Sequence, residues 1–376
     1  MFVYTYDIKM AVIAFPFVAL LITFPVLLWH YHRFGAISRW SILMLYSFVF
    51  YLMCAYFLII LPLPSISAVA KLTTPRYNLH PLLFIREFLE YNPFRLTNVH
   101  TWLPALKAPT VIQPVFNIFL TVPFGFYLRT YFKRSWWQTI LMSFGLSLFF
   151  ELTQLSGLYG IYPRPYRLFD VDDLLMNTTG GLLGFWGARL ALPLLPSSEH
   201  VLERLRPQAD KVSTFRHATA FVVDWIIISI VSGLLSIVAG QFGASQAVDN
   251  LIMLLVMGVV VLLPELLKGK TLGLHVVHLR LAGRGAGQAT KGQVLTRFLG
   301  GYVLIIVWNI FAFINRFVSA DSFASRWIGI GLFVFSLVFF LIIGVDLLID
   351  VFRPSHELLF EKVSRTRLVS TYGHSD

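Results

Sequence analysis

Long apolar stretches constrain the fold of this chain more than any other feature of its sequence. A helix of about 20 apolar residues is long enough to cross the roughly 30 Å hydrocarbon core of a bilayer, whereas a barrel strand reads as about ten residues of alternating polarity. The sequence therefore predicts an all-α, polytopic helical membrane protein with about nine transmembrane helices in two bundles. The stretches lie near residues 10–30, 40–62, 112–132, 137–157, 173–195, 218–240, 248–267, 297–317 and 327–350.

The distribution of basic residues predicts how the chain crosses the bilayer. If successive loops alternate between the two sides, one side holds 19 of the 30 lysines and arginines and the other holds 10, with Arg189 at the end of a span. Because cytoplasmic loops carry an excess of lysine and arginine, the first side is predicted to be cytoplasmic. The N-terminus is then outside and the C-terminus is cytoplasmic.

The net charge of +11 comes from the same basic residues in the loops. The basic residues flank the spans, where anionic lipid headgroups attract them, so we expect membrane lipids and not nucleic acid as partners. Only 13% of the residues are charged, against about a quarter in soluble proteins. The one cysteine, Cys54, lies inside a predicted span, which leaves no disulfide and no thiolate metal site.

Polar residues gather where three predicted spans approach the outer boundary of the bilayer. They come from the third span, from one face of the fourth, and from the start of the fifth with the loop before it. Ionisable groups beside lipid are costly, so each is a candidate functional residue. The set comprises Asn117, Glu151, Gln154, Arg167, Asp170, Asp172, Asp173 and Asn177.

We favour the interpretation that these residues line an outward-facing polar pocket. The alternative is an internal network in which Arg167 neutralises the carboxylates and the helices are locked together. Acids also favour the positive end of a helix macrodipole, but this explains one or two of the three aspartates. The loop between the second and third predicted spans, residues 63–111, is rich in proline. It is predicted to carry a short amphipathic helix over residues 81–92 on the outer surface.

The same residues carry a resemblance to a known family. The pattern N-x5-P-x-G-F begins at Asn117, E-x2-Q begins at Glu151, and R-x2-D-x-D-D-x3-N-x2-G-x3-G begins at Arg167. Over about residues 40–195 the chain resembles the VanZ-like family of bacterial membrane proteins. Because members are associated with teicoplanin resistance, the resemblance implies a protein of the bacterial plasma membrane with a role at the cell envelope and no established reaction. It also implies that the eight polar residues are signature positions.

Residues 197–215 are polar and predict a cytoplasmic linker between two halves. In the second half, ionisable residues near the cytoplasmic ends of the spans are expected to meet in the inner leaflet. We favour ion pairing for assembly, with a proton or cation path as the alternative. These residues are Arg216, Asp224, Arg297, Asp346 and Asp350.

The second half resembles the RDD family. Arg216, Ala220 and Asp224 match the lead-in R-x3-A-x3-D, and KGKTLG at residues 268–273 fits the family's central loop. A closing acid appears as Glu361, where aspartate would be usual. The resemblance implies cation/proton exchange only as proposed for some members. Alternating residues after the central loop predict a small cytoplasmic hairpin that leads to Arg297.

Together these observations predict a VanZ-like transmembrane domain at residues 1–196, the linker at 197–215 and an RDD-like transmembrane domain at 216–370. The favoured function is binding of an envelope lipid or glycolipid, for example a lipid-linked precursor, in the outward-facing acidic pocket. The alternatives are cation/proton transport through the RDD-like half and a membrane-embedded enzyme acting on a lipid-linked substrate. Motifs such as HExxH and GxSxG do not occur, which argues against an enzyme, and we expect no cofactor and no metal.

Overall fold

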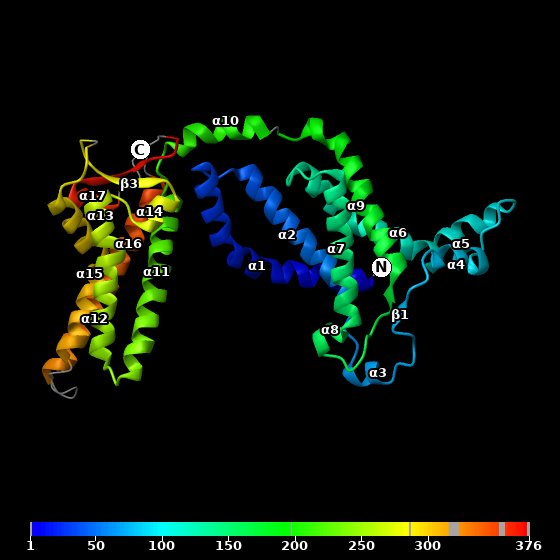
Figure 1. Cartoon of the computed structure of the whole chain (residues 1–376), viewed down its shortest axis with the longest axis horizontal. Helices are drawn as coiled ribbons and strands as arrows, with labels where there is room; N and C mark the ends of the chain where they lie inside the picture. The colour runs from blue at the N-terminus through cyan, green and yellow to red at the C-terminus, as the bar shows by residue number, and fades with distance from the viewer. Residues whose placement is uncertain (1, 197, 286, 316–322, 353–357, 374–376) are drawn as a thin grey trace. The chain divides into compact units, whose positions relative to one another are not determined.

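The chain is an all-α, polytopic membrane protein in the computed structural model shown in Figure 1. The structure describes residues 2–196, 198–285, 287–315, 323–352 and 358–373. Helices make up 75% of the chain. The strands among the described residues form two small two-stranded sheets.

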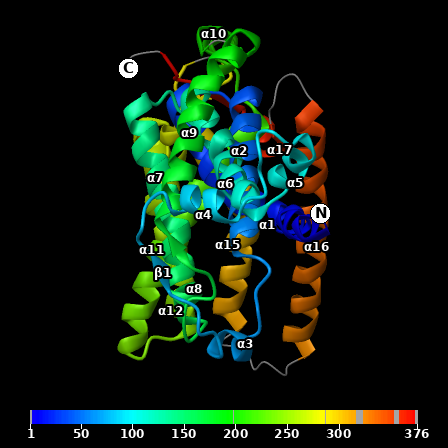
Figure 2. The same cartoon turned by 90° about the vertical axis from the view of Figure 1, so that its right-hand side faces the viewer.

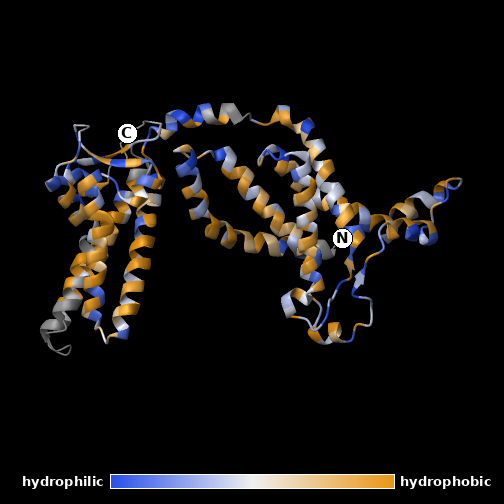
Figure 3. Ribbon diagram, viewed as in Figure 1, coloured by the Kyte–Doolittle hydropathy of each residue, from blue (hydrophilic) through white to orange (hydrophobic). Residues whose placement is uncertain are grey.

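Six helical segments of the described chain are long and apolar enough to cross a membrane. Each coincides with one of the predicted spans, which confirms the fold class. The long helices are mostly apolar along their length, as the hydropathy colouring in Figure 3 shows. The six segments are Tyr6–Phe34, Arg39–Ile60, Pro109–Thr130, Thr214–Gln241, Gln246–Lys268 and Trp327–Asp346.

The other three predicted spans are also helical but are not among these six. They are α7 (Trp136–Leu155), α9 (Val171–Ala191) and α15 (Lys291–Asn315). In two of them polar residues lower the mean hydropathy: α7 carries the stripe that ends in Glu151 and Gln154, and α9 begins with acids. The count of nine transmembrane helices therefore stays a prediction.

The chain divides into two compact units. Unit 1 comprises Met1–Leu21 and Arg39–Ser198, and unit 2 comprises Ile22–Ser38 and Glu199–Asp376. The helix α1 (Phe2–Phe34) contributes to both units. Sequence reasoning did not expect this division of the first span. The predicted linker contains a helix, α10 (Ser198–Ala209).

In unit 1 the helix α9 packs against α6 (Pro109–Thr130) and α7. Glycines allow this close approach, because a Cβ atom on Gly184 would overlap the Val122 carbonyl and one on Gly181 would overlap the Ser143 hydroxyl. The remaining elements of unit 1 are α2 (Arg39–Ile60), α3 (Ile66–Ala70), β1 (Tyr77–Asn78), α4 (Leu83–Tyr91), η1 (Val99–Thr101), α5 (Trp102–Leu106), α8 (Gly157–Gly160), β2 (Phe169–Asp170) and η2 (Leu192–Leu194).

Unit 2 contains long helices that lie side by side and a cap of short elements at one end (Figures 1 and 2). The strand β3 (Leu279–Gly283) pairs antiparallel with β4 (Thr366–Ser370), far away in the sequence, so the predicted local hairpin is wrong. The other elements are α11 (Thr214–Gln241), α12 (Gln246–Met257), the π-helical turn η3 (Gly258–Leu262), α13 (Leu263–Lys268), α14 (Leu272–Val276), α16 (Phe323–Phe352) and α17 (Leu359–Ser364).

Candidate functional site

The start of α9 places three acids at one end of the α6–α9 pair. Asp170 caps this helix, because its Oδ1 accepts a hydrogen bond from the Asp172 backbone N–H at 2.9 Å. The same oxygen accepts a hydrogen bond from Asn78 Nδ2 at 3.0 Å, beside the parallel pairing of β1 with β2. Burial raises the pKa of Asp170, and the nearby Asp172 carboxylate raises it further. Asp170 is therefore held in place by hydrogen bonds while it stays partly exposed.

Asp172 ties the short helix α4 to α9. Its side chain is 5% exposed, and its two oxygens accept the backbone N–H groups of Leu82 and Phe84 at 2.5 and 3.0 Å. These N–H groups belong to the N-terminal turn of α4, which has no intrahelical acceptor for them. Leu82 adopts a left-handed conformation with φ of 65° at this junction. The sequence alone did not indicate that Asp172 would cap a second helix.

Asp173 and Glu151 connect the neighbouring helices. Asn117 Nδ2 on α6 donates to Asp173 Oδ1 at 2.5 Å, and Glu151 Oε2 on α7 accepts the Asp170 backbone N–H at 3.0 Å. One turn further along α9, Asn177 Nδ2 donates to Ser147 Oγ at 2.9 Å. These contacts bring residues of α6, α7 and α9 together, as the sequence analysis predicted, whereas their depth in the bilayer stays a prediction.

The last two predicted residues point to other partners. Gln154 is 5% exposed, and its Nε2 donates to the Ile59 carbonyl of α2 at 3.1 Å. Arg167 is exposed and donates from Nη2 to the Leu61 carbonyl at 3.1 Å. Arg167 thus bonds to a backbone oxygen at the end of α2, in contrast to the carboxylate pairing that the network interpretation expects.

A cavity of about 110 Å³ lies between α4, the start of α6 and the start of α9. We call it the acidic cavity, because its polar lining contains four carboxylic acids and no lysine, arginine or histidine. Asp170, Asp172 and Asp173 line it, whereas the other five predicted residues do not. The complete lining is Leu83, Phe84, Glu87, Pro109, Thr110, Gln113, Pro114, Asp170, Asp172, Asp173 and Met176.

Sequence reasoning missed Glu87, Thr110 and Gln113 as lining residues. Glu87 lies on α4, the helix predicted at the outer surface, and Thr110 and Gln113 lie in the first turns of α6. The signal in the sequence that could have indicated these residues is that the amphipathic helix comes shortly before the third predicted span. Among the residues that the structure describes, no group of three His, Cys, Asp or Glu side chains has the arrangement of a metal site.

A buried ion-pair cluster lies in unit 2. Arg297 on α15 is 7% exposed and approaches two carboxylates, Glu265 Oε1 at 3.6 Å from Nε and Glu361 Oε1 at 3.4 Å from Nη1. Glu265 and Glu361 are 6% and 1% exposed. The predicted inner-leaflet set included Arg297 but omitted both of its acidic partners.

The other members of the predicted set bind backbone or hydroxyl groups. Arg216 is fully buried and donates to the carbonyls of Val277, Ala209, Lys211 and His278 and to the Ser370 hydroxyl. It therefore joins the start of α11 to β4 and to the residues just before β3, which differs from the expected meeting with aspartates. A guanidinium has five N–H donors, and converging carbonyl groups can accept all of them.

Both buried aspartates of the set hold the starts of short helices. Asp224 accepts hydrogen bonds from the Thr271 hydroxyl at 2.5 Å and from the Gly273 backbone N–H at 2.7 Å, at the N-terminus of α14. Asp346 Oδ2 accepts the Leu359 backbone N–H at 2.6 Å, at the start of α17. The side chain of Asp350 lies outside the part of the chain that the structure describes.

The two units correspond to two family matches. Residues 48–192 match the VanZ/LLP1 family, and this range contains every residue of the acidic cavity. Residues 212–364 match the RDD family, and this range contains Arg216, Asp224 and the Arg297 cluster. The chain joins a VanZ-like region to an RDD region. No curated protein and no solved structure matches the chain.

Proposed function

We propose that the VanZ-like region binds the polar head of an envelope lipid or glycolipid in the acidic cavity. The observation that carries this proposal is a cavity whose polar wall consists of acids and neutral hydrogen-bonding groups, with apolar side chains beside them. Carboxylates accept hydrogen bonds strongly from hydroxyl and ammonium groups. A sugar or an amine headgroup provides such donors, and the attached lipid keeps it at the membrane.

The size of the cavity limits which part of the ligand it encloses. A water molecule takes about 30 Å³ of the liquid, so a cavity of about 110 Å³ holds only a few non-hydrogen atoms. We therefore propose that one sugar face or one ammonium group enters the cavity while the rest of the lipid stays outside. Leu83, Phe84 and Met176 supply the apolar contacts for the part that enters.

Two glutamates on α4 give this proposal a matched test. Glu87 lines the cavity, whereas Glu90 on the same helix pairs with Arg86 at 2.8 Å on an exposed surface. We expect Glu87→Gln and Asp173→Asn each to weaken binding of a lipid-linked cell-wall precursor about tenfold, because a hydrogen bond to a charged group is worth about 1.5 kcal/mol or more. Glu90→Gln should bind like the unaltered protein.

Binding is measured by titrating fluorescently labelled precursor into purified protein, with glycopeptide susceptibility of cells as a second readout. Equal affinities for Glu87→Gln, Asp173→Asn and Glu90→Gln would refute the proposal. A new product detected by mass spectrometry after incubation with the precursor would instead support the enzyme alternative.

The RDD region supports cation or proton transport as a second candidate function. One cation, Arg297, lies between two buried carboxylates, Glu265 and Glu361, so the cluster carries an excess negative charge unless a proton or cation is bound. Proteoliposomes that hold the protein should then dissipate a pH gradient when Na⁺ or K⁺ is added. Loss of this flux in Glu265→Gln supports transport, and absence of flux in the unaltered protein rejects it.

A further inference from the structure

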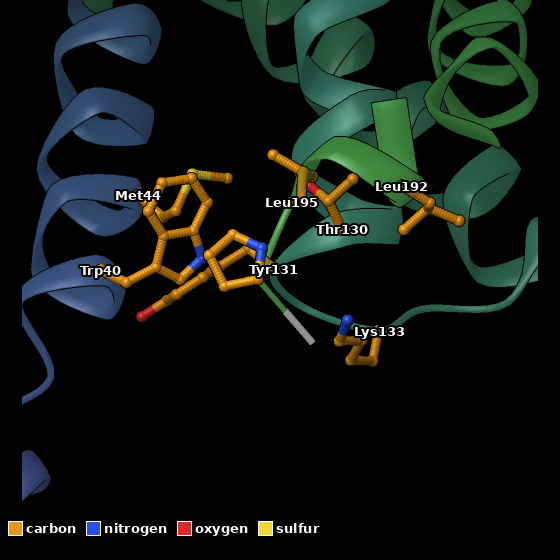
Figure 4. Close-up of a pocket in the computed structure, with 8 residues that line it drawn as sticks. Trp40, Met44, Thr130, Tyr131, Lys133, Leu192 and Leu195 are labelled. Carbon is orange, nitrogen blue, oxygen red and sulfur yellow. The ribbon is translucent and has the colours of Figure 1, made fainter. Parts of the chain in front are cut away.

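A second, larger cavity lies at the opposite end of α6 from the acidic cavity. Its volume is about 260 Å³, and we call it the basal cavity. Figure 4 shows Trp40 and Met44 of α2 on one side and Thr130, Leu192 and Leu195 on the other, with Lys133 at the edge. The full lining is Trp40, Met44, Thr130, Tyr131, Lys133, Leu192, Leu195 and Pro196. All of these residues belong to unit 1.

The charged residues of the segments that form the basal cavity are all basic. The three segments that form it, residues 39–50, 124–140 and 183–196, contain no aspartate or glutamate. They contain five basic residues, which are Arg39, Arg129, Lys133, Arg134 and Arg189. Lys133 is exposed at the edge of the cavity and has no hydrogen-bond or ion-pair partner among the described residues. The cavity therefore suits an anion that also carries an apolar group.

The aromatic side chains at and near this cavity are typical of the depth of lipid headgroups. Trp136 and Trp137 begin α7 just after Lys133, and their rings stack with centroids 4.1 Å apart. They are 43% and 64% exposed. Tryptophan and tyrosine are enriched at the membrane interface, and Trp40 and Tyr131 line the cavity itself. Basic pockets between membrane helices on the cytoplasmic side commonly bind anionic lipid headgroups.

The backbone at Lys133 supports a role for its side chain. Lys133 follows the C-terminus of α6 and has φ of 54°, a left-handed conformation that glycine adopts without steric cost. The residue at this position is a lysine, although glycine would fit the left-handed backbone better. The ammonium group at the cavity edge gives a reason for the lysine.

We propose that the basal cavity binds an anionic phospholipid of the leaflet predicted to be cytoplasmic. Lys133 contacts the phosphate, and Met44, Leu192 and Leu195 contact the part of the lipid next to the headgroup. The site is distinct from the acidic cavity in place, charge and ligand, and it holds a structural or regulatory lipid whether or not the acidic cavity binds its own ligand.

The test uses the full-length protein and native mass spectrometry with phosphatidylglycerol and phosphatidylcholine as the two probes. We expect the protein to bind phosphatidylglycerol about tenfold more tightly, because both lipids carry the phosphate but the quaternary ammonium of phosphatidylcholine cancels its negative charge beside the basic residues. Lys133→Gln and Lys133→Gly should lose this preference, and Lys133→Arg should keep it. Lys71→Gln, which changes an exposed lysine elsewhere in unit 1, should also keep it.

Lys133→Gly also guards against a loss caused by misfolding. Since glycine fits the left-handed backbone, this variant should melt at or above the temperature of the unaltered protein in phosphatidylcholine. A lipid preference that survives in both Lys133→Gln and Lys133→Gly would overturn the proposal. An equal loss in Lys71→Gln would also overturn it, because the effect would then reflect overall charge.

Two further experiments, one with a variant that fills the cavity and one with a soluble competitor, identify the ligand. Leu195→Trp should reduce binding of phosphatidylglycerol by filling the cavity, and unchanged binding would contradict the assignment to this site. Soluble glycerol 3-phosphate at the same concentration should not displace the lipid. If it competes as strongly as phosphatidylglycerol does, the occupant is a free phosphate ester and the lipid proposal is wrong.

Discussion

The VanZ-like and RDD regions both contain acids in apolar surroundings, but the groups that surround these acids differ between the two regions. In the VanZ-like region four acids line a cavity whose wall contains no basic residue. In the RDD region Arg297 lies between Glu265 and Glu361, and Asp224 holds the start of α14. An acid in a membrane segment is therefore a weak guide to function until its partners are known. Glu87 and Asp173, which lie beside an open space, are candidates for contact with a ligand, whereas acids that accept backbone N–H groups, such as Asp172 and Asp224, hold short helices in place.

The largest effect should come from removing the cation of the RDD cluster. Arg297→Met leaves Glu265 and Glu361 buried without their partner, which we expect to cost about 3–5 kcal/mol. Thermal melting and limited proteolysis of the RDD region measure the loss. The triple variant Arg297→Met, Glu265→Gln, Glu361→Gln should recover most of the stability, because no uncompensated charge remains. Similar melting of the single and unaltered proteins would contradict a structural role for the cluster.

A smaller and local effect should follow from changing the acid that holds α4. Asp172→Asn replaces charge-assisted bonds to Leu82 and Phe84 with weaker ones and converts one acceptor into a donor. We expect a loss of about 1.5–3 kcal/mol at this contact. Hydrogen exchange should quicken in Leu83–Tyr91 and stay unchanged in the RDD region. If hydrogen exchange in α4 is equally slow in Asp172→Asn and in the unaltered protein, other contacts position α4.

The cap of the RDD region should respond to pH through His278. Burial lowers the pKa of His278, and the nearby His32 and Arg216 lower it further. A histidine whose folded pKa is depressed contributes stability above its unfolded pKa of about 6.5, and this stability is lost as the pH falls towards the folded value. Melting of His278→Gln should depend less on pH between about 5 and 7. An identical pH dependence in the two proteins would exclude His278 as the cause.

The smallest effect on stability should come from the exposed acids of α4. Glu90 is paired with Arg86 on the surface, where such pairs add little, and Glu87 is exposed at the cavity. We expect Glu87→Gln and Glu90→Gln to melt like the unaltered protein, while only Glu87→Gln binds the lipid-linked precursor more weakly. A fall in melting temperature for Glu87→Gln would mean that this acid supports the fold rather than a ligand.

Hydropathy and helical spacing predicted the fold class, because every expected span is helical. They also placed Asn117, Glu151 and Asp173 at one depth, since a helix rises about 1.5 Å per residue. The hydrogen bonds of Asn117 with Asp173 and of Glu151 with the Asp170 backbone place these residues at one level of the helix bundle.

The spacing of residues along the chain could not predict which groups each side chain or strand contacts. Arg216 and Asp224 looked like two members of one cluster, yet each binds groups of the cap that are distant in sequence. The strand partner of β3 lies at Thr366–Ser370, and local alternation of residues carries no information about it. Glu87 was missed for the same reason, because its place at the cavity depends on how Asp172 holds α4.

A structure of the protein in native membranes tests the central claim most directly. The claim is that the acids at the start of α9 line a ligand site, whereas the buried charged groups of the RDD region bond to other protein groups. We predict non-protein density in the acidic cavity within hydrogen-bonding distance of Asp173, with α4 in its present place over Asp172. A cavity closed by collapse of α4 onto α6, with the carboxylates bonded only to protein groups, would contradict the claim.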